Sequence, residues 1–143
     1  MNTKNIGIVS ELKIMSELVS KGIVVSQPYG DNAPYDFIID INGDLLKIQI
    51  KTAEKLKSDS MKISLCKRVG AKRLGRELYS SLEIDAVIAY SREENEFYFI
   101  NLHDYKDVQE FVIRPKRFIK SKNNNIHIAE EFTMKKKLFN ELH

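Results

Sequence analysis

Residues 34–53, PYDFIIDINGDLLKIQIKTA, carry two strand-like runs on either side of the dipeptide Asn42-Gly43. Asn-Gly between alternating apolar residues is the strongest short-range signal for a β-hairpin with a two-residue turn. In such a hairpin the numbers of facing residues sum to 85, so Asp36 is expected opposite Gln49. Their Cβ atoms would then lie about 4.5–5.5 Å apart on one face.

The two faces of this predicted hairpin differ in polarity. Side chains alternate along strands, so Lys51 shares the polar face with Asp36 and Gln49. The opposite face is apolar and is expected in the core; it consists of Tyr35, Phe37, Ile39, Ile41, Leu46, Ile48 and Ile50. The polar face is then either solvated surface or a site that uses an acid and a base together.

The composition fits one globular unit. The chain has 143 residues and a mass of 16.6 kDa, with 43% hydrophobic and 30% charged residues, which predicts a single domain over residues 1–143. No stretch approaches the ~18 apolar residues of a membrane span, and no signal sequence is recognisable. One cysteine and three histidines without zinc-ligand spacing argue against disulfides and structural zinc. We therefore expect a cytoplasmic protein without membrane contact.

The remaining pattern predicts an α/β fold with a mixed sheet of four or five strands. The first helix is expected over residues 5–21, ended by Gly22, with a buried apolar stripe formed by Ile8, Leu12, Met15 and Val19. Strands are predicted at 23–27 and 61–66, a second hairpin at 84–102, and a helix at 129–143. Loops, with at most short helical turns, are expected at 66–79 and 103–125.

Positive charge is concentrated in two runs, although the net charge is only +3. The first run contains Lys67, Arg68, Lys72, Arg73 and Arg76, and the second contains Arg114, Lys116, Arg117, Lys120 and Lys122. Two basic runs without local acids favour a polyanionic partner such as DNA, the alternative being ordinary solvated surface. Ser26 and Gln27, at the end of a predicted strand, are further candidates for contacting a phosphate.

Several of these motifs together resemble the PD-(D/E)XK nuclease superfamily. Tyr35-Asp36 stands where Pro-Asp is usual, and Gln49-Ile50-Lys51 stands where (Asp/Glu)-X-Lys is usual, after a helix that bears Glu11. The segments IDAVIAYSREENEFYFINL and IHIAEEF are similar to the subgroup of bacterial group I intron homing endonucleases. The hairpin region is also similar to archaeal Holliday-junction resolvases.

The resemblance implies a restriction-endonuclease-like core, a mixed β-sheet flanked by helices, with a Mg²⁺ or Mn²⁺ site. Asp36 would supply a carboxylate, Gln49 an amide oxygen and Ile50 its backbone carbonyl, with Glu11 as an accessory acid that binds through water. Lys51 would orient or help deprotonate the attacking water and offset charge on the phosphate. Gln49 replaces the usual acid and so removes one negative charge from the site.

The resulting functional hypothesis is a metal-dependent, site-specific double-strand DNA endonuclease of the homing type. One small protomer covers about one turn of duplex, so a homo-oligomer, dimer or tetramer, is expected. The second hairpin and the C-terminal Leu138 and Phe139 are its predicted contact surface. Two alternatives remain open: a Holliday-junction resolvase, and a non-catalytic DNA-binding module in which Gln49 marks a decayed site.

Overall fold

The structure, a computed structural model, describes residues 1–69, 75–80, 82–120 and 126–139. Its central sheet has the strand order β1-β2-β3-β8-β9. These strands are Val24–Ser26, Phe37–Ile41, Asp44–Thr52, Ala86–Ser91 and Glu96–Asn101, respectively. β3 and β8 run parallel and the other neighbours are antiparallel, so the sheet is mixed, as predicted.

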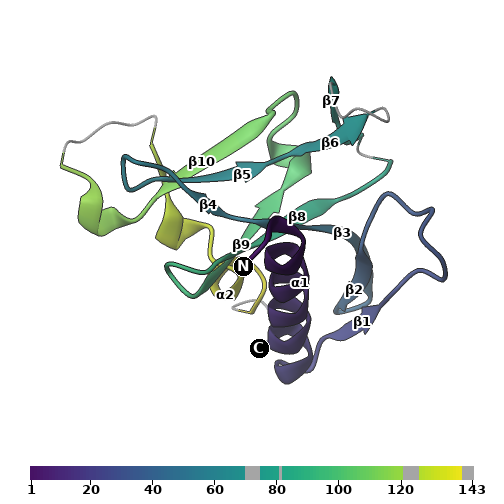
Figure 1. Ribbon diagram of the computed structural model, residues 1–143. Helices are drawn as coiled ribbons and strands as arrows, with labels where there is room; N and C mark the ends of the chain where they lie inside the picture. Colours follow the sequence, from purple (N-terminus) through teal and green to yellow (C-terminus); the bar gives the residue numbers. More distant parts are fainter. Residues whose placement is uncertain (70–74, 81, 121–125, 140–143) are drawn as a thin grey trace.

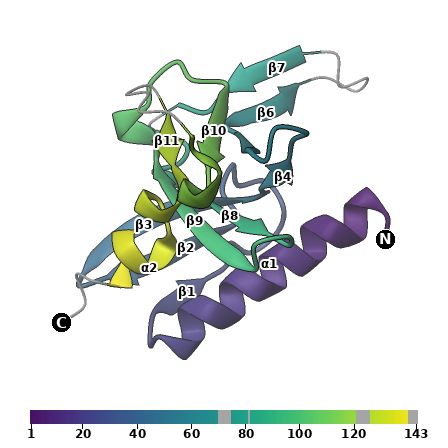
Figure 2. The ribbon, with the colours of Figure 1, turned by 90° about the vertical axis from the view of Figure 1, so that its left-hand side faces the viewer.

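A second, four-stranded sheet has the order β11-β10-β5-β4. Its strands are His127–Ile128, Glu110–Arg114, Met61–Ser64 and Glu54–Lys55. A separate antiparallel pair is formed by β6 (Cys66–Val69) and β7 (Gly75–Leu78). Helices α1 (Thr3–Ser20) and α2 (Met134–Lys137) lie on the side of the central sheet away from this second sheet (Figures 1 and 2). Three 3₁₀ helices complete the fold: η1 (Leu102–Asp104), η2 (Lys116–Phe118) and η3 (Ala129–Glu131).

The central sheet therefore separates two hydrophobic cores. Ile14 and Leu18 of α1 pack with Ile48 of β3 and Ile88 of β8 in the first core. The second core lies between the sheets and includes Ile63, Val87, Ala89, Ile100 and Phe111. Because both faces are covered, β8 is buried along its whole length.

The β2–β3 hairpin has the predicted register. Asn42 and Gly43 have φ angles of 53° and 94°, which suits a two-residue turn with both residues in the left-handed region. Ile41 pairs with Asp44, and Phe37 pairs with Ile48 at the other end of β2. The predicted apolar face is confirmed for Phe37, Ile39, Ile41 and Ile48, which are buried in the first core, and for Leu46 and Ile50, which pack against it.

Tyr35 was wrongly assigned to that face, because it packs against the second core. The chain enters β2 only at Phe37, after a bend, so strict alternation does not extend back to Tyr35.

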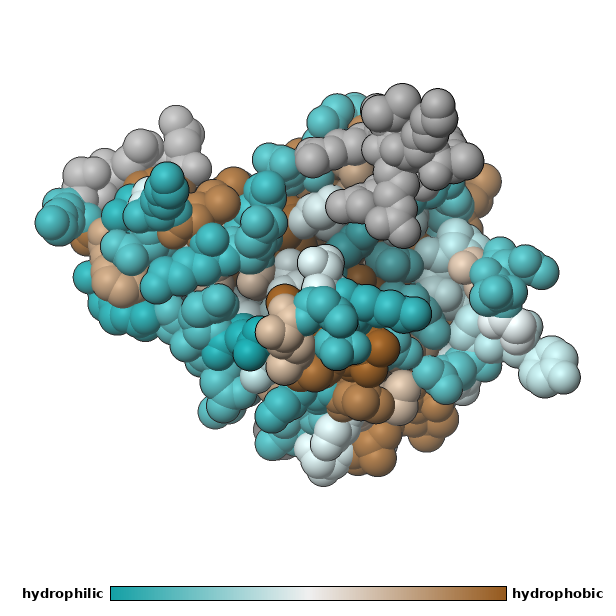
Figure 3. All heavy atoms as spheres, viewed as in Figure 1, coloured by the Kyte–Doolittle hydropathy of each residue, from teal (hydrophilic) through white to brown (hydrophobic). Residues whose placement is uncertain are grey.

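The predicted apolar stripe of the first helix is also largely wrong. Ile8, Leu12 and Val19 are 47%, 60% and 58% exposed, and only Met15 packs against the first core. Hydrophobic residues accordingly appear along α1 on the surface in Figure 3. The buried stripe instead consists of Ser10, Ile14 and Leu18, in steps of four. Ser10 is accommodated there because its hydroxyl lies 2.8 Å from that of Thr52 in β3.

Several predicted loops contain strands. Residues 66–79 include β6 and β7, and residues 103–125 include β10, so the expected four or five strands were too few. β10 forms because Phe111 and Ile113 point into the second core while the strand pairs with β5. Within the described residues, no helix is long and apolar enough to cross a membrane.

The predicted contact surface for oligomerisation is wrong for the two C-terminal apolar residues. Leu138 and Phe139 are 4% and 9% exposed and belong to the first core. In the described residues, the helix expected at 129–143 consists only of η3 and the single turn α2. These short elements place the two side chains in the first core, against the central sheet.

Candidate active site

Asp36 is fixed against the middle of β3 by two backbone hydrogen bonds. Its N–H donates to the carbonyl of Ile48 at 2.8 Å, and its Oδ2 accepts from the N–H of Ile50 at 2.7 Å. These bonds involve the residues on either side of Gln49. The carboxylate therefore lies beside Gln49, as the register of the hairpin predicts.

The polar face of β3 is turned toward the second sheet. Gln49 and Lys51 are in register with Val87 and Ala89 of β8, and neighbours in register share a face of the sheet. Val87 and Ala89 belong to the second core. Gln49 and Lys51 are accordingly half-buried.

The ammonium group of Lys51 is held by the β6–β7 segment. Its Nζ donates to the carbonyl of Cys66 at 3.0 Å and lies 5.4 Å from the centroid of the Tyr79 ring, within reach of a cation–π contact. Neither Cys66 nor Tyr79 was predicted as part of the site. A backbone carbonyl and an aromatic ring that approach from a distant segment leave no local signal in the sequence.

Glu11 approaches the same place from α1. It is half-buried, and Gln27 Nε2, just after β1, lies 3.5 Å from its Oε1. Burial raises the pKa of Glu11, and the charge of Asp36 raises it further. Ser26 is exposed in β1, where it pairs with Ile38.

Burial also raises the pKa of Asp36, although the Ile50 N–H and the Lys51 ammonium act in the opposite direction. For Tyr79, burial and then the charge of Asp36 raise the phenol pKa to about 12, so this ring is neutral at pH 7. Both carboxylates thus ionise less readily than free acids. A bound cation would favour their ionised form.

The candidate ligand atoms are oxygens, which suit a hard divalent cation. They are the carboxylates of Asp36 and Glu11, the amide oxygen of Gln49 and the backbone carbonyl of Ile50, the ligand types that Mg²⁺ prefers. Elsewhere too, the described part of the chain holds no group of three or more His, Cys, Asp or Glu side chains placed for a metal. Only two of these candidate ligands, Asp36 and Glu11, are acids. Metal binding would therefore also depend on the Gln49 amide oxygen and the Ile50 carbonyl.

The predicted DNA-binding cations occupy two separate places. The strands that carry the first run, β6 and β7, and the 3₁₀ helix η2 of the second run lie at opposite ends of the molecule in Figure 1. Cys66, whose carbonyl binds Lys51, is the first residue of β6, so only the first run adjoins the candidate site. Lys72 and Arg73 lie outside the described residues, and Arg68 and Arg76 are placed only by their backbone in β6 and β7.

Two of these cations have acidic partners from other segments. Lys67 Nζ lies 2.6 Å from Glu83 Oε2, and Arg117 Nη2 lies 2.5 Å from Glu94 Oε1. Lys116 is exposed in η2, and Arg114 is half-buried in β10. Because no acid lies within either run, the sequence alone overestimated the free positive charge of the two runs.

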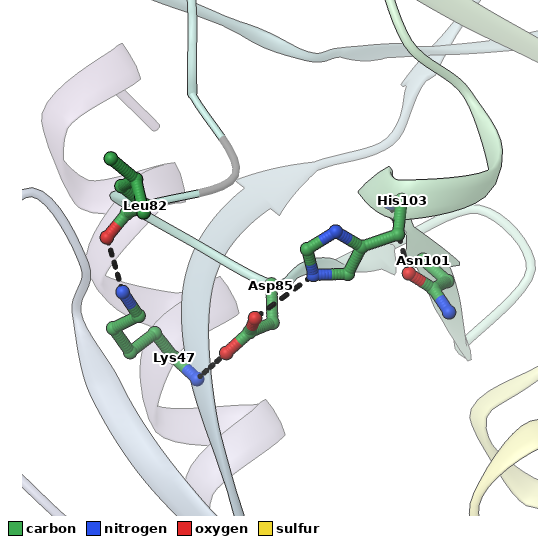
Figure 4. Close-up of polar contacts among 5 residues, drawn as sticks. All are labelled: Lys47, Leu82, Asp85, Asn101 and His103. Carbon is green, nitrogen blue, oxygen red and sulfur yellow. Dashed lines mark hydrogen bonds and ion pairs between the residues drawn. The ribbon is translucent and has the colours of Figure 1, made fainter.

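A second polar cluster adjoins β3 at Lys47, three residues before Ile50 (Figure 4). Asp85 Oδ2 accepts from the N–H of Lys47 at 2.9 Å, and Asp85 Oδ1 lies 3.0 Å from His103 Nε2. The Lys47 ammonium donates to the carbonyl of Leu82, and the side chain of Asn101 accepts from the N–H of His103. The cluster joins β3, the start of β8 and η1 through one contact between side chains and several between a side chain and the backbone.

Comparisons with known proteins agree with this fold. The model of the PD-(D/E)XK endonuclease family matches residues 1–135. A solved structure of a bacterial homing endonuclease, I-Ssp6803I, superposes with a TM-score of 0.76 at 21% identity, covering 93% of this chain and 89% of that one. At this identity the likeness concerns the fold. No curated protein sequence gives a significant match. On the family match, the chain belongs to the PD-(D/E)XK endonucleases.

Proposed function

We propose that this nuclease is a site-specific endonuclease of the homing type, which cuts both strands of DNA with Mg²⁺ or Mn²⁺. The observation that carries the proposal is the fixed position of the Asp36 carboxylate beside the Gln49–Lys51 segment. The likeness of the fold to a bacterial homing endonuclease supports the choice of class. In this proposal residues 1–143 act as one nuclease domain.

PD-(D/E)XK nucleases generally use divalent metal ions. When bound, such an ion polarises the phosphate and lowers the pKa of a coordinated water. Asp36 would bind it directly, with the oxygens of Gln49 and Ile50, and Glu11 would bind through water. The Ile50 N–H fixes the Asp36 carboxylate, so the ligand is oriented before any ion arrives.

Lys51 would act on the substrate side of the same site. Its ammonium is held by the Cys66 carbonyl and the Tyr79 ring on the polar face that carries Gln49. From there it can orient the attacking water and stabilise negative charge that develops on the phosphate. Because Lys51 is half-buried, its fixed positive charge has a larger effect than it would in bulk water.

The direct experiment is digestion of a plasmid library with the wild-type protein in Mg²⁺, followed by sequencing of the cut ends. Recurrent double-strand ends at one sequence, absent in EDTA, are expected. Random nicking would contradict site specificity. Cleavage confined to a four-way junction, with a linear duplex of the same sequence left intact, would replace the proposal with the resolvase.

The second candidate function is a non-catalytic DNA-binding module. Gln49 supports it, because the site lacks the usual acid. Gln49→Glu restores that charge and should bind Mg²⁺ more tightly. If the wild-type protein binds DNA without cutting it and Gln49→Glu cuts, the protein is a binding module with a decayed site. If the wild-type protein already cuts, Gln49 is a working substitute for the acid.

We also propose a homo-oligomer, dimer or tetramer, because one site of this kind cuts one strand and a double-strand break needs two. With Leu138 and Phe139 buried, the apolar side chains left exposed on the first helix are Ile8, Leu12 and Val19. Light scattering at micromolar concentration tests the assembly. A monomer that still cuts both strands of one specific site would contradict it.

A further inference from the structure

A cavity of ≈ 630 Å³ adjoins the candidate site at the carboxyl ends of β3 and β8. It is lined by the last residues of β3, the short strand β4, the residues that follow β8 and the first two turns of α1. Ile50 and Lys51 belong to this lining, so the cavity is continuous with the candidate site. It has a larger volume than the other four cavities described in the chain, which measure ≈ 150–470 Å³.

The position of this cavity is one where α/β proteins bind ligands. In open α/β sheets, ligands bind outside the carboxyl ends of the parallel strands. β3 and β8 are neighbours and run parallel in the central sheet. Their ends stay together beyond the last paired residues, because the N–H of Ala53 donates to the carbonyl of Tyr90 at 2.9 Å.

The charges around the cavity favour an anion. Lys51, Lys55 and Arg92 line it, against the two acids Glu54 and Glu93. Lys62 lies 3.7 Å from Glu54 and partly offsets its charge. The first turn of α1, which opens on the cavity, contains no acid, and the positive end of the helix dipole adds to the field.

We propose that this cavity binds a backbone phosphate of the DNA through Lys55 and Arg92. This phosphate is next to the phosphate at which the DNA is cut. The inference rests on the proposed nuclease function. Both side chains are exposed and belong to neither basic run, which is why the charge pattern of the sequence did not single them out. In this arrangement the DNA strand passes from Lys51 over the start of α1.

The first test compares Lys55→Gln/Arg92→Gln with the control Lys57→Gln/Lys136→Gln, which removes the same charge from exposed lysines outside the cavity. Binding to a short duplex is measured by fluorescence anisotropy in EDTA over a range of salt. Losing one phosphate contact should reduce the slope of log K against log salt by about one. The control should keep the wild-type slope and melting temperature.

The second measurement locates the phosphate. Single phosphates around the cut are replaced by neutral methylphosphonates, and binding is measured for wild type and for the cavity variant. One replacement next to the cut should weaken the wild type and leave the variant unchanged. If the cavity and control variants have the same slope while the wild type binds and cuts, this inference is wrong and the proposed function stands. If the wild type neither binds nor cuts duplex DNA, both fail.

Discussion

Two aspartates contact β3 in the same way, at residues three apart along the strand. Asp36, just before β2, accepts a hydrogen bond from the N–H of Ile50 at 2.7 Å. Asp85, just before β8, accepts one from the N–H of Lys47 at 2.9 Å. Each carboxylate ties the start of a neighbouring strand to β3, and the hydrogen bonds alone do not distinguish a site from a structural link.

The surrounding charges do distinguish them. Burial would raise the pKa of Asp85, but the Lys47 N–H and His103 outweigh it and hold that pKa below its usual value. Burial raises the pKa of Asp36, and its acidic neighbour is Glu11. The charge of Asp85 is therefore compensated within the fold. The charges of Asp36 and Glu11 favour a cation from outside, as the proposed metal site requires.

The largest expected effect is the loss of cleavage in Asp36→Asn and in Lys51→Ala. Each removes a charge that acts on the reacting phosphate, so the rate constant should fall ~100- to 1,000-fold or more. Single-turnover cleavage of the identified target in saturating Mg²⁺ measures it. DNA affinity in EDTA should stay within a few-fold of wild type, and full activity in either variant would remove that residue from the active site.

The matching change at the other aspartate should affect stability. Asp85→Ala leaves the partly buried Lys47 N–H without its acceptor, at a cost of ~1–3 kcal/mol in the free energy of unfolding. Urea denaturation at pH 7 measures this cost. Well below the melting temperature, the cleavage rate constant of the folded variant should change little. A loss of cleavage as large as that of Asp36→Asn would erase the distinction between the two aspartates.

A smaller effect is expected from Tyr79, which contacts Lys51 through its ring. Tyr79→Leu removes a cation–π contact of ~0.5–2 kcal/mol and should lower the single-turnover rate constant about tenfold. Tyr79→Phe keeps the ring and should cut as well as wild type. Equal loss in both variants would show that the hydroxyl, rather than the ring, matters.

The sequence predicted the hairpin and its facing residues because Asn42-Gly43 determines the register of the whole strand pair. It failed where a contact joins distant segments. Glu83 and Glu94 lie 16 and 23 residues from their partners Lys67 and Arg117, so the basic runs looked uncompensated.

The buried stripe of α1 was missed for a similar reason. Ser10 is polar and is buried only because a hydroxyl of β3 meets it. The candidate acids were predictable from the motif, whereas the groups that position Lys51 were not, because one of them is a backbone carbonyl.

The smallest expected effect is a difference in sign between the two aspartates when stability is measured against pH. The pKa of Asp36 is raised in the folded state, so its ionised form opposes folding at pH 7. Asp36→Asn should therefore be slightly more stable than wild type at pH 7. This difference in stability should close as pH falls below the folded pKa of Asp36, where the wild-type carboxyl is protonated.

The pKa of Asp85 is lowered, so its charge stabilises the fold above the unfolded value of 3.8. Asp85→Asn should be less stable at pH 7, with a gap that closes as pH falls through the folded pKa of Asp85. Urea denaturation of both variants and wild type from pH 7 to below pH 3.8 measures the two gaps, and gaps of the same sign at pH 7 would contradict the electrostatic difference between the two aspartates.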